Sequence, residues 1–164
     1  MTILNTHIDY IRGLLAKGGP DPEDYEALDQ WNAEMARREK AGSLPEEEKQ
    51  ALVECLGDAL SLETMQGFAF RKPHGYAGDF EIIDRIYTRY ECPREELRKW
   101  DQYFHRQEAP QAVRNRKELF CRMLDGLGEE PKRILNIASG PARDVHDWMA
   151  PGKPRHEITC LDMD

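Results

Sequence analysis

Apolar residues recur at helical spacing from the N-terminus to about residue 125, with polar residues between them. This spacing turns one side of each segment toward a core, so it predicts a series of amphipathic helices. Glycine and proline separate the segments, because neither continues a helix well. The predicted helices cover residues 3–15, 22–40, 46–62, 80–90, 93–104 and 110–124.

Residues 65–79 interrupt this pattern. They combine glycines, a proline and aromatic rings without a clean period, which predicts a structured loop between two helices. Asp79 stands at its end, where its carboxylate is expected to cap the helix that begins at Phe80.

The period changes again after residue 132. Residues 133–139 and 157–161 are short apolar runs of strand length, and residues 145–149 between them suit a short helix. Two strands joined through a helix pair in parallel by a right-handed crossover. The fold class predicted is therefore a mostly α N-terminal region (1–128), followed by the start (β-α-β) of a Rossmann-like α/β domain (129–164).

Composition narrows the class of protein. The net charge is -8 and the pI is near 5.2, which argues against nucleic-acid binding. No apolar run is long enough for a membrane span and no signal pattern begins the chain, so a cytoplasmic location is expected. The four cysteines are scattered, which predicts reduced thiols and no metal site.

Gly140 and Asp162 carry the candidate chemistry. Each follows one of the two predicted strands, and they are 22 residues apart. A glycine at the first turn lets a ligand approach the backbone closely, and an acid after the second strand accepts hydrogen bonds from ribose hydroxyls. An ordinary crossover whose glycine only serves the turn remains an alternative.

The glycine pattern disfavours a dinucleotide. The loop lacks G-x-G-x-x-G, and Asp144 places a negative charge where a pyrophosphate would lie. S-adenosylmethionine has no phosphate and is cationic, so acids near the loop suit it better. A dinucleotide oxidoreductase is therefore a poor third alternative.

Two segments resemble motifs of class I S-adenosylmethionine-dependent methyltransferases. They are residues 133–144 (RILNIASGPARD) and 158–164 (ITCLDMD). Within that group, residues 72–81 (KPHGYAGDFE) and 112–116 (AVRNR) are similar to segments of the bacterial 3-hydroxypalmitic acid methyl ester (extracellular factor) biosynthesis proteins.

This resemblance implies a role for individual residues. Ala138, Ser139 and Gly140 would approach the methionine part of the cofactor, Asp162 would hold the ribose, and Asp164 would flank the adenine. It further places Asp144, Tyr76 and Asp79 near the cofactor's charged end and assigns Arg114 and Arg116 to a substrate carboxylate.

The family implies O-methylation of a fatty acid or other small-molecule carboxylate. A carboxylate is already ionised, so no catalytic residue is assigned. Because only two strands precede the last residue, we expect an incomplete domain, truncated after the second strand and inactive as this chain. The helical region would act as a lid and substrate region.

A second class of function remains open. The chain would then be a non-catalytic helical interaction module with vestigial cofactor-binding strands. The exposed strand edge predicts a homo-oligomer in either case.

Overall fold

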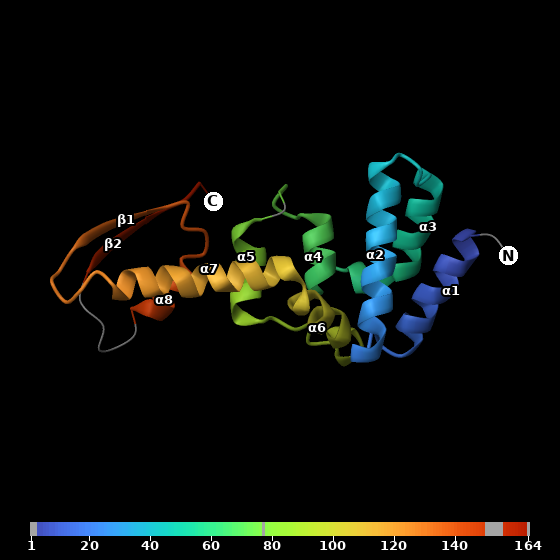
Figure 1. Ribbon diagram of the computed structural model, residues 1–164, viewed down its shortest axis with the longest axis horizontal. Helices are drawn as coiled ribbons and strands as arrows, with labels where there is room; N and C mark the ends of the chain where they lie inside the picture. Colours follow the sequence, from blue (N-terminus) through green and yellow to red (C-terminus); the bar gives the residue numbers. More distant parts are fainter. Residues whose placement is uncertain (1–2, 77, 150–155, 164) are drawn as a thin grey trace. The chain divides into compact units, whose positions relative to one another are not determined.

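The computed structural model describes residues 3–76, 78–149 and 156–163, most of which are helical (Figure 1). The α-helices are α1 (Ile3–Ala16), α2 (Tyr25–Lys40), α3 (Glu46–Leu56), α4 (Met65–Arg71), α5 (Phe80–Thr88), α6 (Arg98–Arg106), α7 (Glu108–Asp125) and α8 (Arg143–Trp148). The strands are β1 (Arg133–Ile137) and β2 (Glu157–Leu161), and the 3-10 helices are η1 (Pro22–Asp24), η2 (Gly57–Leu60) and η3 (Glu95–Leu97). The expectation of a mostly helical chain is confirmed.

The chain packs as two compact units. The first comprises residues 1–71 and 91–104, and the second comprises residues 72–90 and 105–164. This division concerns packing, so the functional boundary predicted between residues 128 and 129 stays a prediction.

The first unit has an apolar core formed by residues from helices that are distant in sequence. Its buried members are Leu14, Leu28, Ala59, Cys92, Leu97, Trp100 and Tyr103. Hydrogen bonds fix the register of α2 on α6, because the Tyr103 hydroxyl donates to Asp29 Oδ1 (2.6 Å) and accepts from Asn32 (2.8 Å). Trp100 belongs to this core and Trp31 packs against it.

Two predictions in this unit are wrong. The third helix ends at Leu56 because Gly57 adopts a positive φ of 48°, and Leu62 beyond it is exposed. Residues 65–71, predicted as loop, form α4. Asp101 stabilises its first turn by accepting a hydrogen bond from Met65 N (2.7 Å), a contact across 36 residues that no local pattern reveals.

The second unit begins with the helix that Asp79 caps. The Oδ1 atom of Asp79 accepts a hydrogen bond from Ile82 N (2.9 Å), which confirms that Asp79 caps α5. Ile82 and Ile86 are buried on the inner side of α5, and Arg89 ends the helix in the left-handed conformation.

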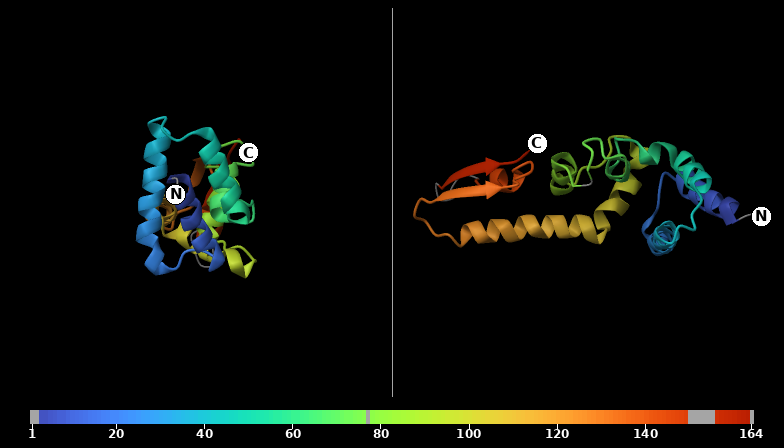
Figure 2. Two further views of the ribbon diagram at one scale, coloured as in Figure 1. Left: turned by 90° about the vertical axis from the view of Figure 1, so that its right-hand side faces the viewer. Right: turned by 90° about the horizontal axis from the view of Figure 1, so that it is seen from above.

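The predicted parallel pair is present. β1 pairs with β2 from Arg133 opposite Glu157 to Ile137 opposite Leu161, and α7 runs along one side of both strands (Figures 1 and 2). Successive side chains point to opposite faces. One face carries Leu135, Ile137 and Leu161, which are 59%, 68% and 55% exposed. The sheet therefore has an exposed apolar face.

Among the described residues, no helix is both long enough and apolar enough to cross a membrane.

Candidate functional site

Gly140 and Asp162 lie together at the carboxyl ends of the two strands. Asp162 Oδ2 accepts a hydrogen bond from Gly140 N (2.5 Å), and its Oδ1 accepts one from Met163 N (2.7 Å). Ser139 N donates to Leu161 O (3.2 Å), which brings the loop after β1 against the end of β2. The two residues that the sequence singled out are thus direct neighbours.

The loop after β1 has an unusual backbone. Ala138, Gly140 and Ala142 have φ values of 56°, 53° and 50°, all in the left-handed region. Non-glycine residues pay a steric cost there, so tertiary contacts must hold the conformation. A Cβ built on Gly140 would meet no atom within 4 Å, so open space lies on the side to which a side chain would project. Without a side chain at Gly140, a ligand could approach the backbone closely from that side.

Asp144 lies in the first turn of α8. Its Oδ1 accepts a hydrogen bond from Val145 N (2.8 Å), and its carbonyl oxygen accepts one from the Cys121 thiol (3.8 Å). Burial raises the pKa of Cys121, and the nearby Asp144 raises it further, so the thiol stays protonated as a donor.

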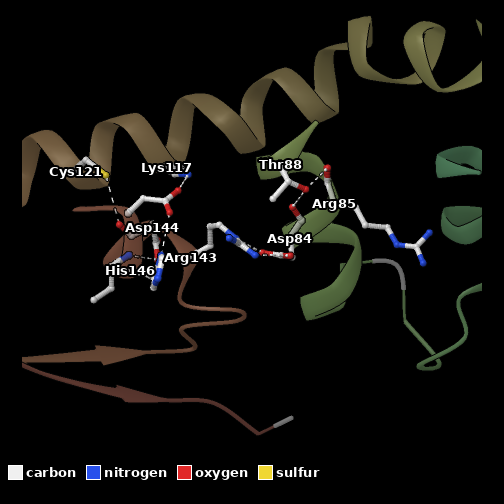
Figure 3. A network of polar contacts seen from close by, with 10 residues as sticks. Asp84, Arg85, Thr88, Lys117, Cys121, Arg143, Asp144 and His146 are labelled. Carbon is white, nitrogen blue, oxygen red and sulfur yellow. Dashed lines mark hydrogen bonds and ion pairs between the residues drawn. The ribbon is translucent and has the colours of Figure 1, made fainter. Parts of the chain in front are cut away.

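Ion pairs attach α8 to the neighbouring helices α5 and α7 (Figure 3). Arg143 forms two hydrogen bonds with Asp84 of α5, Nε to Oδ1 (2.5 Å) and Nη2 to Oδ2 (3.0 Å). Lys117 of α7 pairs with Asp147, and its hydrogen bond is the main cause of a lowered pKa of Asp147. Sequence reasoning missed Asp84 and Lys117, because neither lies within a motif and both act on residues distant in the chain.

Tyr76 and Asp79 occupy different environments. Tyr76 is 43% exposed, whereas Asp79 is only 1% exposed and holds the first turn of α5. Their contact with a cofactor stays a prediction. His74 Nε2 forms a hydrogen bond with Glu81 Oε2 (3.1 Å), which links the loop to the first turn of α5. Asp164 lies outside the described residues.

Arg114 and Arg116 differ in burial, although both belong to α7. Arg114 is half-buried, and its Nη2 donates to His105 O (2.7 Å). Arg116 is exposed. Trp148 is buried, and its indole donates a hydrogen bond to Asp125 Oδ1 (2.8 Å), so it is a packing residue.

Within residues 3–76, 78–149 and 156–163, no group of three or more His, Cys, Asp or Glu side chains is arranged to hold a metal ion. No family model, curated protein or solved structure matches the chain.

Proposed function

We propose that the loop after β1 and the end of β2 bind S-adenosylmethionine, as the start of a Rossmann-like methyltransferase domain. One observation carries the proposal: the Asp162 carboxylate and the Gly140 amide are in contact at the ends of two adjacent parallel strands. Ligands of open α/β sheets bind outside the carboxyl ends of the strands.

The residues present fit an adenosyl group. Each carboxylate oxygen has two acceptor directions, so a carboxylate at the position of Asp162 is the kind of group to which two ribose hydroxyls can donate. Ala138, Ser139 and Gly140 offer small side chains, and the negative charge of Asp144 suits a cationic ligand better than a phosphate. The cofactor, when bound, supplies an electrophilic methyl group.

The acceptor in this proposal is a carboxylate of a fatty acid or other small molecule. Such a group is ionised at neutral pH and needs no general base, so the protein has to hold the reactants in line and exclude water. Residues of this chain would therefore act by binding and orientation.

Binding of S-adenosylhomocysteine, the demethylated cofactor, tests the proposal. In calorimetric titrations of the full chain we expect saturable binding, and Asp162→Ala should weaken it tenfold or more. Hydrogen bonds to a charged acceptor contribute roughly 1.5–3 kcal/mol each.

Glu157→Gln is the matched control. Glu157 is the first residue of β2, at the opposite end of the strand from Asp162. Its side chain is 66% exposed and forms an ion pair with Arg133. The Glu157→Gln variant should bind S-adenosylhomocysteine with the same affinity as the wild type. Equal binding by Asp162→Ala, or none by the wild type, would refute the proposed site.

A second candidate function is a non-catalytic interaction module. The exposed apolar face of Leu135, Ile137 and Leu161 favours it, because parallel sheets are normally covered on both faces. This candidate predicts self-association through the strands, with a mass above the monomer in sedimentation equilibrium. Leu135→Lys should then restore the monomer, and a wild type that is monomeric at every concentration would exclude it.

A further inference from the structure

The loop after β1 has a strained backbone, so other contacts must hold it. Ala138 and Ala142 have φ values of 56° and 50°, in a region that residues with a side chain rarely adopt. Such a conformation persists only where the surrounding structure fixes it. The same loop keeps the Gly140 amide beside Asp162, so the contacts that hold the loop also shape the candidate site.

On one side, the loop is attached to the end of β2. Ser139 N donates to Leu161 O (3.2 Å), and Gly140 N donates to the Asp162 carboxylate (2.5 Å). A turn hydrogen bond from Ala142 N to Ser139 O (3.1 Å) closes the loop on itself. None of these three contacts ties the left-handed Ala142 to a neighbouring helix.

The next residue supplies an attachment on the other side. Arg143 directly follows Ala142, and its side chain reaches Asp84 on α5 (Figure 3). Nε donates to Oδ1 (2.5 Å) and Nη2 donates to Oδ2 (3.0 Å). Two parallel hydrogen bonds fix the direction of the guanidinium group as well as its distance. The side chains are 36% and 31% exposed, so water competes less with this pair than with a fully exposed one.

Helix α5 is a firm support for the carboxylate of Asp84. Asp79 caps its first turn by accepting a hydrogen bond from Ile82 N (2.9 Å). The side chains of Ile82 and Ile86 are buried on its inner side. Asp84 lies between these two residues in the sequence, in the middle of the helix. The pair therefore attaches the loop to an element that is itself capped and packed.

We propose that Asp84 and Arg143 are positioning residues of the candidate site. Their ion pair holds Ala142 in its left-handed conformation and thereby keeps the Gly140 amide on Asp162. A loop that is ordered before a ligand arrives costs less affinity than one that must be ordered on binding. The consequence for S-adenosylmethionine rests on the proposed function, whereas the effect on the loop does not.

The first test follows the Gly140 amide in the chain without cofactor. This N–H must leave Asp162 before it exchanges with solvent, so its exchange rate, measured by NMR, reports how often the loop opens. Asp84→Ala should raise the rate at least fivefold. Arg143→Ala and the double variant should raise it by about the same factor, because the two side chains act as one pair.

Asp147→Ala is the matched control. Asp147 pairs with Lys117 of α7, so its loss also removes one ion pair from α8, but four residues beyond Arg143. This variant should change the Gly140 exchange rate less than twofold. An equal rise in Asp147→Ala, or no rise in Asp84→Ala, would overturn the positioning role, because the pair would then serve only the packing of the helices.

Two features keep the comparison decisive. Asp84 and Asp147 are both helical, and alanine favours a helix, so both variants should fold. Should Asp84→Ala not fold, Asp84→Asn decides the matter, since it keeps the shape of the side chain and removes its charge. Its Gly140 exchange rate should rise at least threefold, and an unchanged rate would overturn the proposal.

The affinity for S-adenosylhomocysteine is the second readout. In calorimetric titrations, Asp84→Ala should weaken binding at least fivefold and Asp147→Ala less than twofold. Unchanged binding by Asp84→Ala would overturn the link between the ion pair and the ligand. If the wild type does not bind at all, the proposed function fails, while the Gly140 exchange rates still decide whether the pair positions the loop. The two failures are therefore distinguishable.

Discussion

Gly67 shows how closely two segments of the first unit approach. A Cβ at this position would lie 2.0 Å from the Ser61 carbonyl oxygen and 2.4 Å from the Leu60 carbonyl carbon. Both atoms belong to the backbone, so they cannot move aside as a flexible side chain would. Gly67 is therefore required by packing and not by its backbone conformation.

Gly67→Ala should destabilise the protein by about 3 kcal/mol, because the added methyl overlaps fixed atoms. Gly13→Ala is the matched control, since it lies within α1 and its Cβ would meet nothing within 4 Å. That change should stabilise the protein by about 0.5–1 kcal/mol through helix propensity. Urea unfolding followed by circular dichroism measures both, and equal effects of the two substitutions would contradict the packing described.

Glu48 makes the stability depend on pH. Arg38 of α2 donates to both of its oxygens, Nη1 to Oε1 (2.6 Å) and Nη2 to Oε2 (2.8 Å), which lowers the pKa of Glu48 below its usual 4.5. A carboxyl with a lowered folded-state pKa stabilises the fold above its unfolded-state pKa and loses that contribution as the pH falls. Glu48 is therefore held in an ion pair and is only 12% exposed.

Glu48→Gln should lower the free energy of unfolding by about 1 kcal/mol at neutral pH. The difference from the wild type should shrink as the pH falls from about 5 toward 3, because the wild-type carboxyl then becomes protonated. Glu47→Gln, an exposed position in the same turn, should show no such dependence. A Glu48→Gln deficit that persists unchanged at pH 3 would contradict the ion pair's role.

At the scale of the elements, sequence patterns predicted those helices and strands whose positions depend on nearby residues. The helical spacing identified α1, α2, α5 and α7, and the change of period identified β1 and β2. Asp79 was predicted as a cap because its partner, Ile82 N, is only three residues away. Hydrophobic periodicity predicted the elements that pack through one regular face, and the capping pattern predicted the start of α5, because the cap and its partner lie within one turn.

The errors occur where distant contacts determine an element. The first turn of α4 depends on a hydrogen bond to Asp101. The sequence of α4 does not predict a helix, because glycine and aromatic residues interrupt the helical pattern. Arg143 is held by Asp84, which is 59 residues away. Within the candidate site, the pairing of Gly140 with Asp162 was predictable because both positions follow strands. The left-handed backbone of Ala138 and Ala142 was not, since neither residue favours it.

At the scale of the molecule, the two units differ in what they expose. The first unit buries a compact apolar cluster, whereas the second carries the parallel strands, their exposed apolar face, and all the described candidate site residues. The proposed S-adenosylmethionine site therefore lies in this unit.

The most direct measurement is an NMR titration of the ¹⁵N-labelled chain with S-adenosylhomocysteine. The account predicts saturable shifts concentrated at the amides of residues 138–140 and 162–163, where the Gly140 amide meets Asp162. Amides of α1–α3 in the first unit should not shift. An unchanged Gly140 signal at saturating ligand, or no binding at all, would contradict the assignment of these strands to an adenosyl site.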